Sequence, residues 1–102
     1  MTEGQIVPEI DVLLHEPARL RVLVLLAALG RADFMYLLRQ SGMSKGNLSV
    51  QMTRLEEGGI VSAEKSLVDG RPRTTFALTS AGRKALGKYK QAMGEILAVL
   101  PD

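Results

Sequence analysis

The chain has 102 residues, a net charge of +2 and no cysteine, which predicts a single domain over residues 1–102 and excludes disulfides, thiolate metal sites and thiol redox sensing. Its only histidine is His15, so a histidine-rich metal cluster or a histidine-based catalytic triad within one chain is also excluded, and we expect no metal and no cofactor. The start lacks a signal peptide pattern, and the longest apolar run is shorter than the ~20 residues of a membrane span, so we expect a cytoplasmic protein.

The first 40 residues predict a flexible start, a short helical segment and two further helices. Residues 1–8 are expected to be flexible, and the apolar residues of "EIDVLLHE" predict a short helix. Pro17 suits the first turn of a longer helix that ends at Gly30. The interior of this helix, "LRVLVLLAAL", is apolar nearly all round, which predicts burial on more than one side. Asp33 then predicts the N-cap of a short helix over "FMYLLRQ".

A third helix is predicted over residues 45–57. Ser44 is suited to its N-cap, and Gly58 and Gly59 are suited to a left-handed stop at its end. Only a few residues, including Gly42, separate this helix from the one before it. That spacing is typical of a helix-turn-helix.

Two β-rich segments follow, "IVSAEKSLV" and "RTTFALT", separated by the turn signal "DGRP". They predict a hairpin whose tip spans Asp69 to Pro72. Thr79 predicts the N-cap of a last helix over residues 80–100. The predicted fold is therefore α+β, mainly α with a small β-hairpin: a winged helix-turn-helix with a three-helix core, a wing and a C-terminal dimerisation helix.

At about 100° per residue, the third helix has two different faces. Leu48, Met52 and Leu55 form an apolar stripe that is expected to face the core. An ordinary solvated outer face is the alternative to a binding face, but the position of the helix between a tight turn and a wing favours DNA recognition. The residues predicted to contact DNA are Ser44, Lys45, Gly46, Asn47, Ser49, Val50, Thr53 and Arg54.

These residues suit different parts of a DNA duplex. Asn47 and Arg54 can each make two hydrogen bonds to a base edge, of adenine and guanine respectively. Val50 and the methyl group of Thr53 can touch a thymine methyl. A small residue such as Gly46 lets the helix backbone approach the duplex closely. The residues suited to phosphates are Ser44, Lys45 and Ser49.

Basic residues are concentrated in the second half of the chain. Residues 65–90 contain seven basic residues and one acidic residue, whereas residues 1–38 contain three basic and five acidic residues. In the wing, Arg71 and Arg73 are predicted to reach phosphates or a narrow minor groove, with a smaller contribution from Lys65. Solubility alone, or a solvated turn, is the alternative explanation of these charges.

The last helix supplies a candidate dimer interface, because five residues follow the 3-4-3-4 spacing of a helix-pairing seam. Gly87 and Gly94 lie one heptad apart beside this seam, where a closely crossing helix would explain their helix-weakening effect. Packing of the helix on its own domain is the alternative. The predicted seam residues are Leu86, Tyr89, Met93, Ile96 and Leu100.

The chain also resembles the small MarR-like winged helix-turn-helix regulators. The matching segments are "HEPARLRVLVLLAALGRADFMYLLRQSGMSKGNLSVQMTRLEEGGIV" and "DGRPRTTFALTSAGRKAL", between His15 and Leu86. The resemblance implies a homodimeric transcription factor that binds an inverted repeat, with DNA contacts at the start of the third helix and at the wing. Larger members have longer flanking helices that form a ligand pocket, and this chain has little material for one. Whether a small-molecule effector exists is left open.

The leading hypothesis is therefore a sequence-specific regulator that binds double-stranded DNA. The alternative is a winged helix that uses the same face for a protein partner, since a fold does not decide function. An enzyme is not expected, because Glu56 and Glu57 are adjacent on a helix and do not face each other, and because no glycine-rich phosphate loop follows a strand. The operator, the target genes and the sign of regulation are not specified by the sequence.

Overall fold

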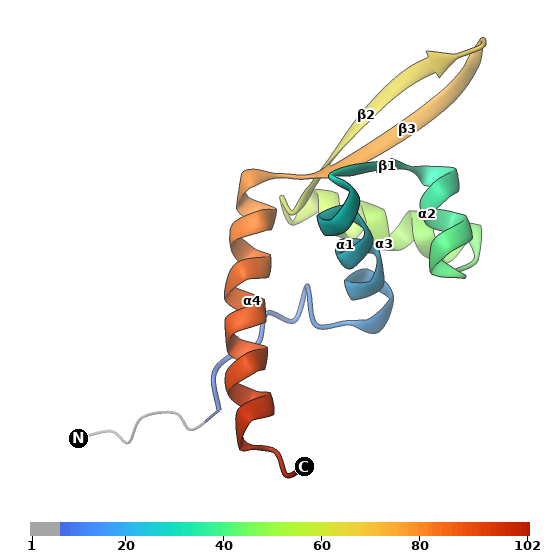
Figure 1. Ribbon diagram of the computed structural model, residues 1–102. Coiled ribbons are helices and arrows are strands. Elements are labelled where there is room, and N and C mark those ends of the chain that lie inside the picture. The colour runs from blue at the N-terminus through green and yellow to red at the C-terminus, as the bar shows by residue number, and fades with distance from the viewer. Residues whose placement is uncertain (1–6) are drawn as a thin grey trace.

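The computed structural model describes residues 7–102, so the predicted flexible start over residues 1–8 lies mostly outside the described residues. Within this part, four helices and a three-stranded antiparallel sheet are arranged as the predicted winged helix-turn-helix (Figure 1). No helix within it has both the length and the apolar character needed to cross a membrane. The elements are α1 (Pro17–Leu29), β1 (Arg31–Asp33), α2 (Phe34–Ser41), α3 (Lys45–Glu57), β2 (Val61–Val68), β3 (Arg71–Leu78) and α4 (Ser80–Val99).

Helix α1 begins and ends where the sequence predicts. Pro17 occupies its first turn, and Gly30 ends it with a φ of +86°. The Glu16 carboxylate caps the helix by accepting a hydrogen bond from the Arg19 backbone N–H at 2.8 Å. On the outer side, however, Val24 remains 57% exposed. A single chain therefore buries only part of the apolar surface of α1.

The helix predicted over "EIDVLLHE" is wrong, because this segment forms a single turn at residues 12–14. The Asp11 carbonyl accepts hydrogen bonds from the N–H groups of Leu14 and His15 at 3.1 and 2.9 Å, which closes the turn. The chain cannot continue as a helix because the proline after Glu16 disfavours helical dihedrals there, and Glu16 is extended. The turn still delivers Leu14, which is fully buried, to the core.

The helix-turn-helix is confirmed, together with both predicted caps. Asp33 caps α2 by accepting a hydrogen bond from the Tyr36 N–H at 2.8 Å, and Gly42 ends α2 in the left-handed region, with a φ of +72°. Ser44 caps α3 by accepting from the Asn47 N–H at 3.1 Å. These local interactions fix where α2 and α3 begin and where α2 ends.

The sheet has one strand more than the sequence predicts. Strand β1 pairs with β3, which also pairs with β2, giving the order β1-β3-β2. Ala32 of β1 lies opposite Phe76, and Val61 of β2 lies opposite Leu78. The additional strand, β1, thus joins the base of the wing to the segment between α1 and α2.

The tip of the hairpin is shorter than predicted. Only Asp69 and Gly70 form the turn, both with positive φ values, of 53° and 74°, as expected for a two-residue hairpin turn. Pro72 therefore belongs to β3, where it lies opposite Leu67. A proline is tolerated at this place because β1 pairs only with residues 75–77, so the other side of β3 has no strand to bond at Pro72.

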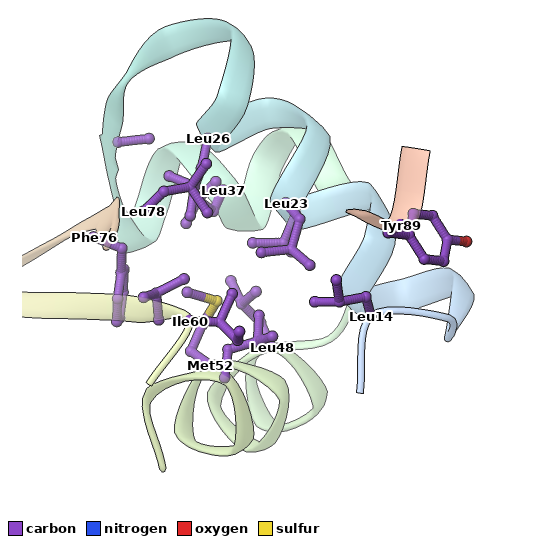
Figure 2. Close-up of a cluster of buried hydrophobic side chains, with 14 residues drawn as sticks. Leu14, Leu23, Leu26, Leu37, Leu48, Met52, Ile60, Phe76, Leu78 and Tyr89 are labelled. Carbon is purple, nitrogen blue, oxygen red and sulfur yellow. The ribbon is translucent and has the colours of Figure 1, made fainter. Parts of the chain in front are cut away.

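The core is one cluster of apolar side chains beneath the sheet and between α1, α2 and α3 (Figure 2). The predicted inward stripe of α3 is confirmed, since Leu48 and Leu55 are fully buried and Met52 is 2% exposed. Leu14 and Tyr89 lie together at one end of the cluster. Because the stripe on one side of α3 is held in this core, the opposite side of the helix faces outward.

Helix α4 starts where the sheet ends and runs away from the wing along one side of the molecule (Figure 1). Its predicted cap is confirmed: the Thr79 hydroxyl accepts a hydrogen bond from the Gly82 N–H at 2.9 Å. The Thr79 N–H donates to the Ile60 carbonyl at 3.0 Å. The start of α4 is thus fixed directly on the backbone that leads into β2.

Candidate nucleic-acid interface

The outer face of α3 carries the residues that the sequence assigns to DNA contact. All eight are exposed, and they lie on one element between the turn and the wing. Val50, at the middle of this face, is 50% exposed. Part of the face is a shallow depression of about 420 Å³, lined by Ser49, Val50, Thr53, Arg54 and Glu57.

Gly46 and Thr53 show what this face offers to a binding partner. Gly46 is helical, and a Cβ atom placed on it would meet nothing within 4 Å, so internal packing does not explain a residue that weakens a helix. The Thr53 hydroxyl donates to the Ser49 carbonyl at 3.0 Å. What Thr53 offers to a partner is therefore mainly its methyl group.

A basic cleft of about 770 Å³ lies between the wing, α2 and the start of α3. Arg71 and Arg73 line it from β3, Lys45 lines it from α3, and Arg39 lines it from α2. Asp33 and Asp69 are the acidic residues in its wall. The cleft therefore joins the arginines of the wing to the N-terminal end of α3, where free backbone N–H groups also favour anions.

The structure separates the three predicted basic residues of the wing. Arg73 lies opposite Ser66, and Lys65 lies opposite Thr74. Because successive strand residues point to opposite faces, Lys65 lies on the other face of the hairpin from Arg71 and Arg73. Of these three wing residues, Arg71 and Arg73 line the basic cleft and Lys65 does not.

Arg73 also lies near an acidic group of the chain. Its Nε atom is 3.9 Å from the Asp33 carboxylate, and about half of the Arg73 side chain is exposed. An exposed ion pair at this long distance contributes little to stability. The Arg73 guanidinium therefore remains able to contact a phosphate.

Two residues near this interface, Arg39 and Gln51, were not predicted from the sequence. Arg39 is in the last turn of α2 and reaches the basic cleft only because α2 packs beside the wing. Gln51 accepts a hydrogen bond from Arg19 at 2.9 Å, a contact between residues far apart in the sequence. Arg39 could have been suspected from its place just before the turn, but no local signal predicts the pairing of Gln51 with Arg19.

The predicted dimer seam on α4 is divided between two environments. Tyr89 is buried in the chain's own core, where its hydroxyl lies 2.8 Å from Nδ1 of His15. Leu86 and Met93 are half-buried and pack against the same core. Farther along, Ile96 is half-buried and Leu100 is 54% exposed. The first half of the seam thus packs on its own domain, and the second half is open.

This arrangement has clear relatives among known proteins. A family model described as a winged helix DNA-binding domain matches residues 18–97. Uncharacterized protein MJ0432 of Methanocaldococcus jannaschii is 37% identical to the chain over 71 residues, which are 70% of this chain and 77% of that protein. Sequence similarity therefore extends over the helix-turn-helix, the wing and most of α4.

Solved structures show the same fold. A transcriptional regulator homologue from Pyrococcus horikoshii OT3 has a TM-score of 0.81 at 25% identity, covering 86% of this chain and 87% of that one. A MarR family transcriptional regulator from Silicibacter pomeroyi DSS has a TM-score of 0.67 at 29% identity; the match covers 85% of this chain but only 57% of the regulator. These relatives are regulators rather than enzymes. The chain therefore belongs to the winged helix DNA-binding domain family and is a small MarR-like transcriptional regulator.

Proposed function

We propose that this regulator binds double-stranded DNA sequence-specifically as a homodimer on an inverted repeat. In each half-site, α3 lies in the major groove and the wing lies on the backbone or in the adjacent minor groove. Two such half-sites are about 34 Å apart, or a multiple of that distance, as expected for a symmetric helix-turn-helix dimer. The base edges are contacted by Asn47, Val50, Thr53 and Arg54. The basic cleft binds phosphates of the DNA backbone.

The observation that carries this proposal is the combination of an exposed polar α3 face with the basic cleft beside it. Lys45, at the start of α3, and Arg71 and Arg73, in the wing, line the same cleft. A single curved polyanion can therefore touch α3 and the wing together. Gly46 supports the close approach, because the space where its Cβ would lie is open.

The same face is a poor match for a protein partner. Interfaces between proteins depend on apolar or aromatic side chains buried at their centre. Of the large apolar residues that are exposed within residues 7–102, Val50 is the one on α3. A polar face with a single valine and a basic cleft suits DNA better than it suits a protein.

Selection of bound duplexes from a random pool tests the proposal. We expect enrichment of an inverted repeat, whose spacing gives the distance between the two α3 helices. A chain that enriches no sequence even at low salt, and that instead recovers one stoichiometric protein partner, would support the protein-interaction alternative.

The open half of α4 supports the homodimer. Ile96 and Leu100 of the predicted seam lie near Leu97 and Val99, which are 60% and 68% exposed. A Cβ atom placed on Gly87 or Gly94 would meet nothing within 4 Å. Packing inside one chain does not explain these helix-weakening glycines, whereas the close approach of a second α4 does.

Charged substitutions in the open half of α4 are expected to separate the dimer. Leu97→Glu and Leu100→Glu each place a carboxylate in the proposed interface, where it would lose solvation. We expect the mass in solution to fall from about twice to about once the 11.1 kDa of one chain, measured by light scattering.

Met35→Glu is the matched control, because Met35 is 51% exposed on α2, away from α4. This variant is expected to keep the mass of the unmodified protein. If all three variants and the unmodified protein have the same mass, α4 is not the dimer interface.

A further inference from the structure

A chain of hydrogen bonds connects the N-terminal turn to the DNA-facing side of α3. The Arg19 guanidinium, on α1, donates from Nε to the Leu13 carbonyl at 2.7 Å. It also donates from Nη1 to Oε1 of Gln51 at 2.9 Å. Gln51 in turn donates from Nε2 to Oδ1 of Asn47 at 3.0 Å. This relay of Arg19, Gln51 and Asn47 ends on a residue that is expected to read a base.

The relay has only one possible direction. A guanidinium donates hydrogen bonds and accepts none, so the group of Gln51 that faces Arg19 must be its oxygen. The Gln51 nitrogen then faces Asn47, and only the Asn47 oxygen can accept from it. The two amides, whose orientation is ambiguous by shape alone, are therefore oriented by the charge at the start of the relay.

The first two members of the relay are held firmly, and the last is free to bind. Arg19 and Gln51 are half-buried, whereas Asn47 is exposed. The third guanidinium nitrogen of Arg19, Nη2, lies 3.4 Å from the Val12 carbonyl, so the turn at residues 12–14 holds this side chain by its backbone. If the Asn47 amide rotated by half a turn, its nitrogen would meet the Gln51 nitrogen, two donors facing each other.

We propose that Arg19 and Gln51 are positioning residues that determine which base Asn47 selects. The Asn47 oxygen is turned toward Gln51, and its nitrogen, with two N–H donors that the relay does not use, is left for the major groove. It therefore prefers a base edge that offers acceptors without a donor beside them, either N7 and O6 of guanine or O4 of thymine, whereas adenine has its N6 donor beside N7. This inference rests on the proposed placement of α3 in the major groove.

The relay changes the expectation drawn from the sequence. A bidentate contact to adenine requires Asn47 to accept from N6 while donating to N7. In the structure, the oxygen that would accept from N6 is turned toward Gln51 and already accepts one hydrogen bond from it, which leaves one lone pair and a fixed amide plane. Loss of the Gln51 donor frees the amide to turn its oxygen toward N6, so adenine is expected to become a better partner when the relay is broken.

The test compares selections from random duplexes by the full-length chain and its variants. The base read by Asn47 is the one whose preference disappears in Asn47→Ala. In the unmodified protein it is expected to be guanine or thymine. Gln51→Met keeps the length of the side chain but removes the amide. At the position read by Asn47, it is expected to reduce the preference for guanine or thymine over adenine about ten-fold, the scale of one lost discriminating contact.

A double variant separates positioning from general structural damage. If Gln51 acts through Asn47, then Gln51→Met should change no base preference in an Asn47→Ala background. Arg19→Lys retains a donor opposite Gln51 and is expected to keep the original preference, whereas Arg19→Met is expected to lose it. Because Arg19 also holds two backbone carbonyls, thermal melting checks the fold of its variants, and the Gln51 result stands without them.

The possible results are distinguishable. An enriched sequence with adenine at the Asn47 position overturns the relay and leaves the proposed function intact. The same holds if Gln51→Met has no effect, or if its effect persists in the Asn47→Ala background. If Asn47→Ala alters no base preference, the relay and the assignment of Asn47 to a base are both wrong, while sequence-specific DNA binding stands. Failure to enrich any sequence overturns the relay together with the proposed function.

Discussion

Replacement of both wing arginines, Arg71→Ala with Arg73→Ala, is expected to weaken binding to every duplex by about 100-fold near 0.1 M salt. The two side chains line the basic cleft, are exposed, and have no strong partner within the described residues. On DNA they replace condensed counterions, and this gain does not depend on base sequence. The loss should therefore be similar for the selected operator and for a scrambled duplex.

The slope of log K against log salt is the more specific measurement. Each phosphate contact contributes about 0.9 to this slope, so a dimer that loses four arginines should lose between about two and four units. Fluorescence anisotropy over a series of salt concentrations measures it.

The matched control is Arg31→Ala. This residue has the same charge but lies on β1, where it is paired with Glu64 at 3.0 Å, and its loss should leave the slope nearly unchanged. Equal slopes for the double variant and the unmodified protein would show that the wing does not contact phosphates.

Gly82→Ala is expected to have the largest effect on stability of any substitution that adds a single methyl group. A Cβ atom at this position would overlap the Ile60 carbonyl, which is backbone and cannot move aside like a side chain. That carbonyl also accepts the hydrogen bond from the Thr79 N–H. The strain should lower the free energy of unfolding by about 3 kcal/mol, equivalent to a fall in Tm of roughly 15 °C.

Gly46→Ala is the matched control for this substitution, since it also lies in the first turn of a helix. A Cβ atom there would be in open space, so alanine should raise the free energy of unfolding by about 0.5–1 kcal/mol. Thermal melting at one fixed protein concentration compares the two, because dimer formation makes Tm concentration-dependent. If Gly82→Ala melts at or above the temperature of the unmodified protein, the start of α4 is not packed on Ile60.

Features set by short-range interactions could be predicted from the sequence. Asp33, Ser44 and Thr79 each cap the helix for which the sequence selects them, because an N-cap depends on its own side chain and the next three residues. The inward stripe of α3 could be predicted for a similar reason, since it needs only the helical period. These local signals were sufficient to place the outer face of α3 in solvent.

Features that depend on distant partners could not be predicted. Strand β1 has three residues and no alternating pattern, and it exists only because β3 passes beside it. The orientation of Asn47 depends on Arg19, which lies on another helix. Gly82 has no positive φ to mark it, and its requirement comes from the Ile60 carbonyl across the fold. In each case the missing information is a tertiary contact.

The placement of α3 in the DNA groove is tested most directly by NMR. Backbone amide resonances of the labelled protein are followed while the selected duplex is added, with a scrambled duplex for comparison. We expect the largest sequence-dependent changes in residues 44–54, and changes with both duplexes in residues 69–73. Perturbations confined to the outer side of α1 or to α4, with the amides of α3 unaffected, would contradict DNA recognition by α3.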